Sequence, residues 1–185
     1  MTLDSFLGYT ITLFFILDPF GNVPIYVSVL AGVPEQKRTR VVIREALIAL
    51  GFLLLVLVFG NAALSALDIS GPAIRLSGGL ILFLIAIRMI YPGEKGTGGG
   101  DASPDSDPLI VPLATPLVAG PSAIAFITIN SPHDPAELLA LGGGVLLAWL
   151  AAALILVFSG RIGRALGDRG LRAVERLMGM LLTIL

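Results

Sequence analysis

The sequence predicts an all-α membrane protein with six transmembrane helices, arranged as two inverted repeats of three helices each. Mean hydropathy is +0.94, and 56% of the 185 residues are hydrophobic while only 14% are charged. A soluble domain usually carries about 25% charged residues, so this composition indicates a membrane protein. Apolar stretches also recur at lengths near the ~20 residues that a helix needs to cross a bilayer. Helices are expected because open strands cannot satisfy their backbone groups in lipid.

The composition also excludes several classes of function. The net charge of -1 leaves no basic field for nucleic acid, and the absence of cysteine removes disulfides and thiolate catalysis. No nucleophile–base set, metal cluster or nucleotide-binding motif is found, so we expect neither an enzyme nor a cofactor. Residues 1–17 contain no Lys or Arg, which favours a retained membrane segment over a cleaved signal peptide.

Six membrane segments follow from the apolar runs, and two of them are interrupted. The first segment is interrupted at Asp18 and the fourth by prolines. The segments are expected at about 5–31, 43–66, 71–91, 109–130, 137–160 and 171–185. Residues 92–108 are rich in Gly, Ser and Asp, so we expect a flexible linker between a first repeat (1–91) and a second (109–185).

The basic residues predict how the chain is oriented. Of the twelve Lys and Arg residues, only Arg75 falls outside the loops after the first, third and fifth segments. Basic loops stay in the cytoplasm, so both termini are expected outside a multi-pass protein of the cell membrane. A topology in which the first and fourth segments are re-entrant hairpins would place the arginine-rich loop 161–176 outside, and the charges therefore disfavour it.

Two sequence matches suggest an internal duplication. Pro19 and Pro24 recur as Pro116 and Pro121, each 97 positions later. The stretch IRLSG in the third segment also resembles ERLMG in the sixth. Because each half would cross the membrane three times, the second half would have the opposite orientation in the membrane. This is the inverted-repeat plan of many secondary transporters, whose binding sites lie near the midplane at broken helices.

The prolines predict two half-helices that meet at an unwound turn in each of these interrupted segments. A free helix N-terminus there would favour an anionic group and free carbonyls a cationic one, which suits a zwitterion such as an amino acid. The expected partners are therefore a small-molecule substrate and the lipid bilayer. The candidate binding residues are Asp18, Pro19, Gly21, Asn22, Pro24, Arg75, Thr115, Pro116, Gly120, Pro121 and Ser122.

Several of these residues have two interpretations. An acid inside the membrane suggests a functional group, here a proton carrier, but Asp18 could equally cap a helix that begins at Pro19. Asn22 could bind substrate or the loosened backbone. Arg75 could bind a substrate carboxylate, pair with Asp18 or extend to the interface. Packing is expected for Ser77, Gly78, Gly79 and Gly142–Gly144, within one chain or between protomers of a homo-oligomer.

The stretches ILDPFGNVPIY (16–26) and VPLATPLVAGPSAI (111–124), with GPAIRLSGG and RLMG, resemble the MarC family of integral membrane proteins. The resemblance implies a six-helix inner-membrane protein akin to small exporters of the lysine-exporter type. Some MarC-like proteins are described as transporters of small neutral amino acids such as glycine and alanine. We therefore expect a secondary transporter, with proton coupling through Asp18 left open. An ion-conducting channel and a non-transporting scaffold are the alternatives.

Two features depart from the family pattern. Ser122 follows Pro121 where the family usually has a glycine, which adds a hydroxyl at the second break. Only nine residues follow Arg176, about 14 Å of helix. We therefore expect the last helix to be short, unless residues 171–175 are drawn into the membrane.

Overall fold

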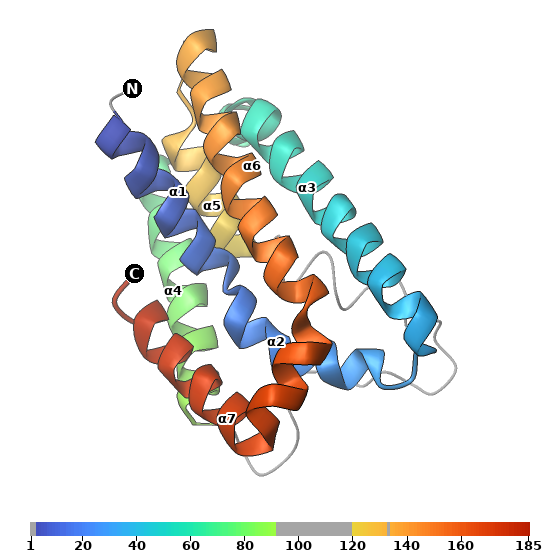
Figure 1. Cartoon of the computed structure of the whole chain (residues 1–185). Coiled ribbons are helices and arrows are strands. Elements are labelled where there is room, and N and C mark those ends of the chain that lie inside the picture. The colour runs from blue at the N-terminus through green and yellow to red at the C-terminus, as the bar shows by residue number, and fades with distance from the viewer. Residues whose placement is uncertain (1–2, 92–119, 133) are drawn as a thin grey trace.

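The computed structural model describes residues 3–91, 120–132 and 134–185, and its regular elements there are all α-helices (Figure 1). The all-helical class is thus confirmed. The helices are α1 (Leu3–Leu17), α2 (Pro19–Leu30), α3 (Glu35–Ala66), α4 (Gly71–Ile90), α5 (Pro121–Asn130), α6 (Pro135–Val157) and α7 (Ser159–Leu182). The predicted linker and the predicted residues Thr115 and Pro116 lie outside the described residues.

Two helices begin earlier than their apolar runs. α3 starts at Glu35, eight residues before the expected position, and α7 starts at Ser159, twelve residues before it. Hydropathy detects only the apolar part of a helix, whereas the turn after Pro34 consists of polar residues with good helix propensity. The first part of α7 is likewise too charged for a hydropathy signal.

Four helical stretches are long and apolar enough to cross a membrane. They are Leu3–Leu30, which combines α1 and α2, followed by α3, α4 and α6. Helix α5 is apolar but has only 10 residues, and α7 does not qualify as a span. The chain is therefore a multi-span membrane protein, while six spans in two inverted repeats remain a prediction.

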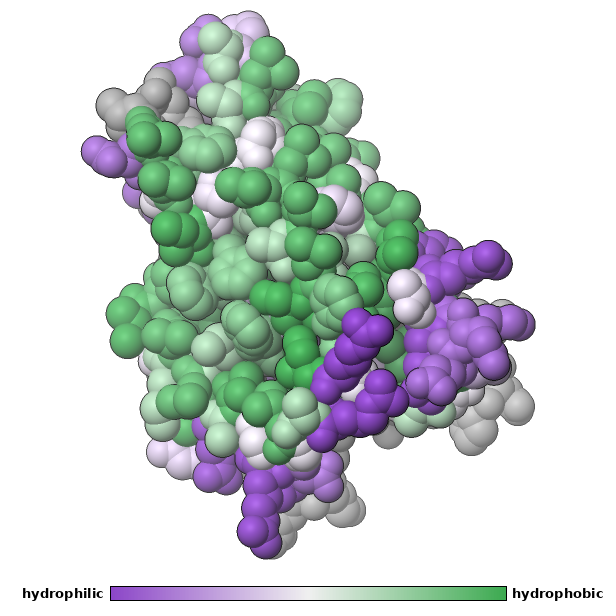
Figure 2. Space-filling view, in the orientation of Figure 1, coloured by the Kyte–Doolittle hydropathy of each residue, from purple (hydrophilic) through white to green (hydrophobic). Residues whose placement is uncertain are grey.

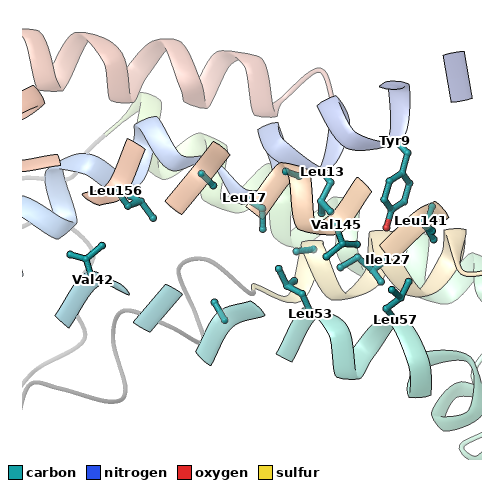
Figure 3. Close-up of a cluster of buried hydrophobic side chains, with 14 of the residues drawn as sticks. Tyr9, Leu13, Leu17, Val42, Leu53, Leu57, Ile127, Leu141, Val145 and Leu156 are labelled. Carbon is teal, nitrogen blue, oxygen red and sulfur yellow. The ribbon is translucent and has the colours of Figure 1, made fainter. Parts of the chain in front are cut away.

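Helix α6 lies at the centre of the bundle, between α1 and α3 (Figure 1). Helix α5 packs against α1, α3 and α4, and α7 packs against α2 and α4. The buried core joins these elements, and Figure 3 shows Tyr9 of α1 projecting towards Leu141, Val145 and Ile127. The Tyr9 ring also stacks on Phe126 of α5, with 5.0 Å between the ring centroids.

The outer surface of the bundle matches a lipid environment. Figure 2 shows hydrophobic side chains over the middle of the molecule and hydrophilic ones gathered towards its two ends. Leu47, Leu55 and Phe59 of α3 are each more than half exposed, which water would disfavour but acyl chains accommodate. The burial pattern thus agrees with the hydropathy of the spans.

Helix α7 is bent and ends beside the middle of the bundle. Its backbone leaves helical geometry at Gly167, where φ is +60°, a value that glycine adopts without steric cost. The last turn then packs Leu182 against Ala86 and Met89 of α4, with Ile16 of α1 at the edge of the same cluster. The second half of α7 therefore packs on α4, and Ile16 near the end of α1 borders this contact.

Candidate functional site at the α1–α2 break

The first membrane-spanning stretch is broken at Asp18 alone. Pro19 has no N–H to continue the helix, and it disfavours helical geometry in the residue before it. Asp18 accordingly adopts a left-handed conformation, with φ 43° and ψ 58°, which aspartate tolerates better than most side chains. Helix α2 starts at the next residue, so the predicted unwound turn is a single residue long.

Side-chain hydrogen bonds satisfy backbone groups of both helices at this break. The Oδ1 atom of Asp18 accepts a hydrogen bond from the backbone N–H of Gly21 at 3.1 Å, which confirms the capping role. The side-chain amide of Asn22 donates to the carbonyl of Leu17 at 3.1 Å, as the backbone interpretation of this residue predicted. Each side chain thus satisfies a backbone group that the break would otherwise leave unpaired.

The break lies inside the protein. Asp18 and Asn22 are both 7% exposed, and Pro19 and Gly21 are buried. Helix α2 continues through Pro24, so the break that the structure shows lies at the first proline of the pair. Pro24 removes one hydrogen bond from α2, but its fixed φ is compatible with a helix, and the turn on either side remains helical.

Two other helices approach the break. The carboxylates of Asp18 and Glu175 of α7 are close enough to repel each other electrostatically. Met89 of α4 reaches the α-carbon of Gly21, where an added Cβ would collide with the Met89 methyl group and the Asp18 carboxylate. The sequence contained this second acid in the ERLMG stretch, but composition alone did not mark it as part of the site.

The predicted residues of the second break are only partly described. Gly120 precedes α5, Pro121 is its first residue, and Ser122 is 8% exposed. Ala123 and Leu17, which directly neighbour Ser122 and Asp18 in the sequence, belong to one buried cluster. The starts of α2 and α5 therefore adjoin the same core.

Arg75 lies away from the break. It lines a cavity of about 560 Å³, together with Asn61, Asp68 and Thr128. Met89 is fourteen positions further along α4, about 21 Å along the helix axis. Arg75 is therefore out of reach of Asp18, and the suggested pairing of the two is wrong. Its position at one end of the bundle fits an interfacial residue.

A larger cavity opens at the other end of the bundle, between α2, α3, the end of α6 and the start of α7. Its volume is about 640 Å³, and Arg164 of α7 approaches Glu35 of α3 there, with 3.5 Å between Nη1 and Oε1. Further lining residues include Val27, Arg38, Thr39, Val42, Ser159 and Arg161. Sequence reasoning missed this cavity because its polar lining comes from helix ends that were predicted as loops.

Glu45 of α3 was also missed. It is completely buried, although it stands just before the charge-free run that marked the second segment. It lies inside the segment expected at 43–66 but was not among the candidate residues. Helix α3 begins at Glu35, so Glu45 lies about three turns along it.

Comparison with known proteins gives a consistent result. The model of the MarC family of integral membrane proteins matches residues 3–185. A "UPF0056 membrane protein" from Buchnera aphidicola subsp. Schizaphis graminum is 41% identical over 99% of this chain and 92% of its own. The "UPF0056 inner membrane protein YhgN" of Escherichia coli K12 is 39% identical over the same shares.

A more distant relative from Chlamydia muridarum, also named "UPF0056 membrane protein", is 32% identical over 99% of this chain and 89% of its own. No solved structure gives a significant match. The matches to the family model and to these relatives cover nearly the whole chain. The chain therefore belongs to the MarC family of integral membrane proteins.

Proposed function

We propose that this protein is a secondary transporter of small neutral amino acids or similar small metabolites in the bacterial inner membrane. One observation carries the proposal: a buried carboxylate, Asp18, interrupts a membrane-spanning helical stretch at its centre. Burying an acid in a membrane is costly, and such residues commonly mark substrate or proton pathways. A cap alone would not require a charge, because asparagine caps helices equally well.

The chemistry of the break suits a zwitterion. The last turn of α1 ends in backbone carbonyls that, with the Asp18 carboxylate, favour an ammonium group. The start of α5, where no side-chain cap is seen among the described residues and the hydroxyl-bearing Ser122 is buried, favours a carboxylate. A small neutral amino acid carries both groups, and its short side chain would need little space beside Met89.

The packing of the helices supports two inverted repeats. Exchanging α2 with α5, α3 with α6 and α4 with α7 converts the contact between α2 and α7 into the one between α5 and α4. The same exchange converts the α2–α6 contact into the α5–α3 contact, and it maps the α3–α6 and α4–α7 contacts onto themselves. The two cavities lie at opposite ends of the bundle, next to exchanged helices. In a transporter, this arrangement would allow a central binding site to open to each side of the membrane in turn.

Transport by purified protein in liposomes tests the proposal. Uptake and counterflow of labelled glycine and alanine are measured with and without a pH gradient, against liposomes without protein. Flux of either amino acid above that background supports the proposal, and its absence in both directions contradicts it. Unitary currents in planar bilayers would favour a channel instead, and neither flux nor current would favour a scaffold.

A further inference from the structure

The larger of the two cavities carries an excess of positive charge. Its lining includes three arginines, Arg38 of α3 and Arg161 and Arg164 of α7, but only one acid, Glu35, which leaves two positive charges uncompensated. The ion pair between Glu35 and Arg164 is 3.5 Å long, and its side chains are 74% and 70% exposed. Exposed ion pairs of this kind contribute little, so a stronger anion could compete for Arg164.

The arginines lie on helix faces that meet across the cavity. Arg38 follows Glu35 by three positions on α3, and Arg164 follows Arg161 by three on α7. Residues at this spacing share one face of a helix. The Glu35–Arg164 contact brings these two faces together, and all four side chains border the same cavity of about 640 Å³. One anion between α3 and α7 could therefore contact arginines from both helices.

Local contacts hold two of the arginines in place. The Nε–H of Arg38 donates to the carbonyl of Val33 at 2.9 Å, and the guanidinium of Arg161 lies over the ring of Phe158, 5.3 Å from its centroid. Among the described residues, neither arginine forms an ion pair with a carboxylate. A guanidinium has five N–H donors in a planar fork, which matches the oxygens of a phosphate group. The cavity therefore suits a phosphate.

The rest of the lining favours a lipid over a free phosphate ion, because much of it is apolar. Helix α7 approaches α2 closely at Gly163, where an added Cβ would lie 2.9 Å from Cγ2 of Val27. Figure 2 shows hydrophilic side chains beside hydrophobic ones at this basic end of the bundle. The apolar lining residues include Val27, Leu30, Val42 and Val157. A phospholipid offers a phosphate and acyl chains together, and basic pockets between membrane helices on the cytoplasmic side suit anionic headgroups.

We propose that this cavity binds an anionic phospholipid, with the phosphate between Arg38, Arg161 and Arg164 and the acyl chains on the apolar part of the lining. The basic residues predict that this end of the bundle faces the cytoplasm, where the membrane surface is negative. On α2 the lining begins at Val27, nine positions and about 13 Å beyond Asp18. The lipid site is thus separate from the break, and it does not depend on the proposed transport.

Native mass spectrometry of the full-length protein tests this site. The protein is purified in a mild detergent, freed of lipid and titrated with dioleoylphosphatidylglycerol or with dioleoylphosphatidylcholine, which has the same acyl chains but no net charge. We expect the wild type to bind phosphatidylglycerol in preference. Replacing both Arg161 and Arg164 by Gln should weaken that binding about 30-fold. Replacing Arg169 and Arg172 by Gln is the matched control, because both are exposed residues of α7 outside the cavity.

A second variant keeps every charge. Gly160 lines the cavity, and nothing lies within 4 Å of its Cβ position among the described residues, so a side chain there enters open space. Gly160→Trp should therefore reduce phosphatidylglycerol binding by filling part of the cavity. Thermal unfolding should show that this variant is folded. Binding at the wild-type level in a folded Gly160→Trp protein would place the lipid elsewhere and overturn the proposal.

Two further outcomes would contradict the lipid site. Equal binding of the two lipids, or an equal loss in the Arg169 and Arg172 control, would show that no specific headgroup site exists at this cavity. Glycerol 1-phosphate, the soluble part of the headgroup, is added in excess as a competitor. Displacement of the bound phosphatidylglycerol by this compound would overturn the lipid assignment and indicate a site for soluble phosphate esters. Retention of the lipid supports the proposal.

Discussion

The carboxylate of Asp18 accepts a hydrogen bond from the backbone N–H of Gly21, and the α-carbon of Gly21 has no room for a side chain. An added Cβ would collide with the carboxylate that forms this hydrogen bond and with the methyl group of Met89. The cap of α2 and the contact with α4 therefore depend on the same small residue. This relationship explains why a glycine stands within the first turn of a buried helix.

Replacing that glycine should disrupt the break. Gly21→Ala is expected to lower the free energy of unfolding by about 1–3 kcal/mol, the usual range for overpacking in a tightly packed core. Thermal unfolding of the purified protein measures this. Gly8→Ala in α1 is the matched control, because nothing lies within 4 Å of its Cβ position. The control should be neutral or slightly stabilising; equal effects of both substitutions would contradict the packing described for Gly21.

Substitutions of Asp18 should separate its cap from its charge. Asparagine at this position would keep the capping oxygen and tolerate the positive φ, so Asp18→Asn should leave the thermal transition nearly unchanged. Asp18→Leu loses the cap, worth about 0.5–2 kcal/mol, and strains the left-handed backbone by about 1–2 kcal/mol. An Asp18→Leu protein with the thermal transition of the wild type would show that the backbone conformation at this residue contributes little to stability. Because the cap alone makes leucine unfavourable, only asparagine tests the role of the charge.

The break itself was predictable from the sequence, because Asp-Pro combines a capping side chain with a residue that cannot continue a helix. Its extent was not. The prolines suggested an unwound turn, yet only Asp18 leaves helical geometry, and α2 continues through Pro24, whose fixed φ is compatible with a helix.

The neighbours of the break were less accessible to sequence reasoning. Glu45 and Glu175 lie inside the segments expected at 43–66 and 171–185, but the sequence does not show which helices these residues approach in the fold. Arg75 was grouped with Asp18 only because both are charged residues in apolar segments, and the geometry of α4 separates them. Tertiary packing decides which charges meet, and a single sequence carries little information about it.

The contact between α4 and α5 provides a further test of the packing. An added Cβ at Gly78 would lie 2.7 Å from the Cβ of Ala125, whereas Gly79 faces open space. Gly78→Ala should therefore destabilise the protein by about 1–3 kcal/mol, and the double variant with Ala125→Gly should recover part of that loss. Gly79→Ala is the control on the same helix. Additive single effects, without recovery, would contradict this contact.

The orientation in the membrane can be tested with single cysteines, since the chain contains none. Gln36→Cys lies at the basic end of the bundle and Ser70→Cys at the opposite end, and both positions are exposed. In intact cells, a maleimide that cannot cross the membrane should label Ser70→Cys only, because basic loops remain in the cytoplasm. Labelling of Gln36→Cys without permeabilisation would reverse the predicted orientation.

We propose that the Asp18 carboxylate couples transport to protons at the break between α1 and α2. Uptake of labelled alanine into liposomes, driven by a pH gradient, tests it most directly when the wild-type protein is compared with Asp18→Asn. The asparagine variant keeps the cap, so a folding defect would not account for a difference. We predict uptake by the wild type and no gradient-driven uptake by Asp18→Asn; equal uptake by both proteins would contradict the claim.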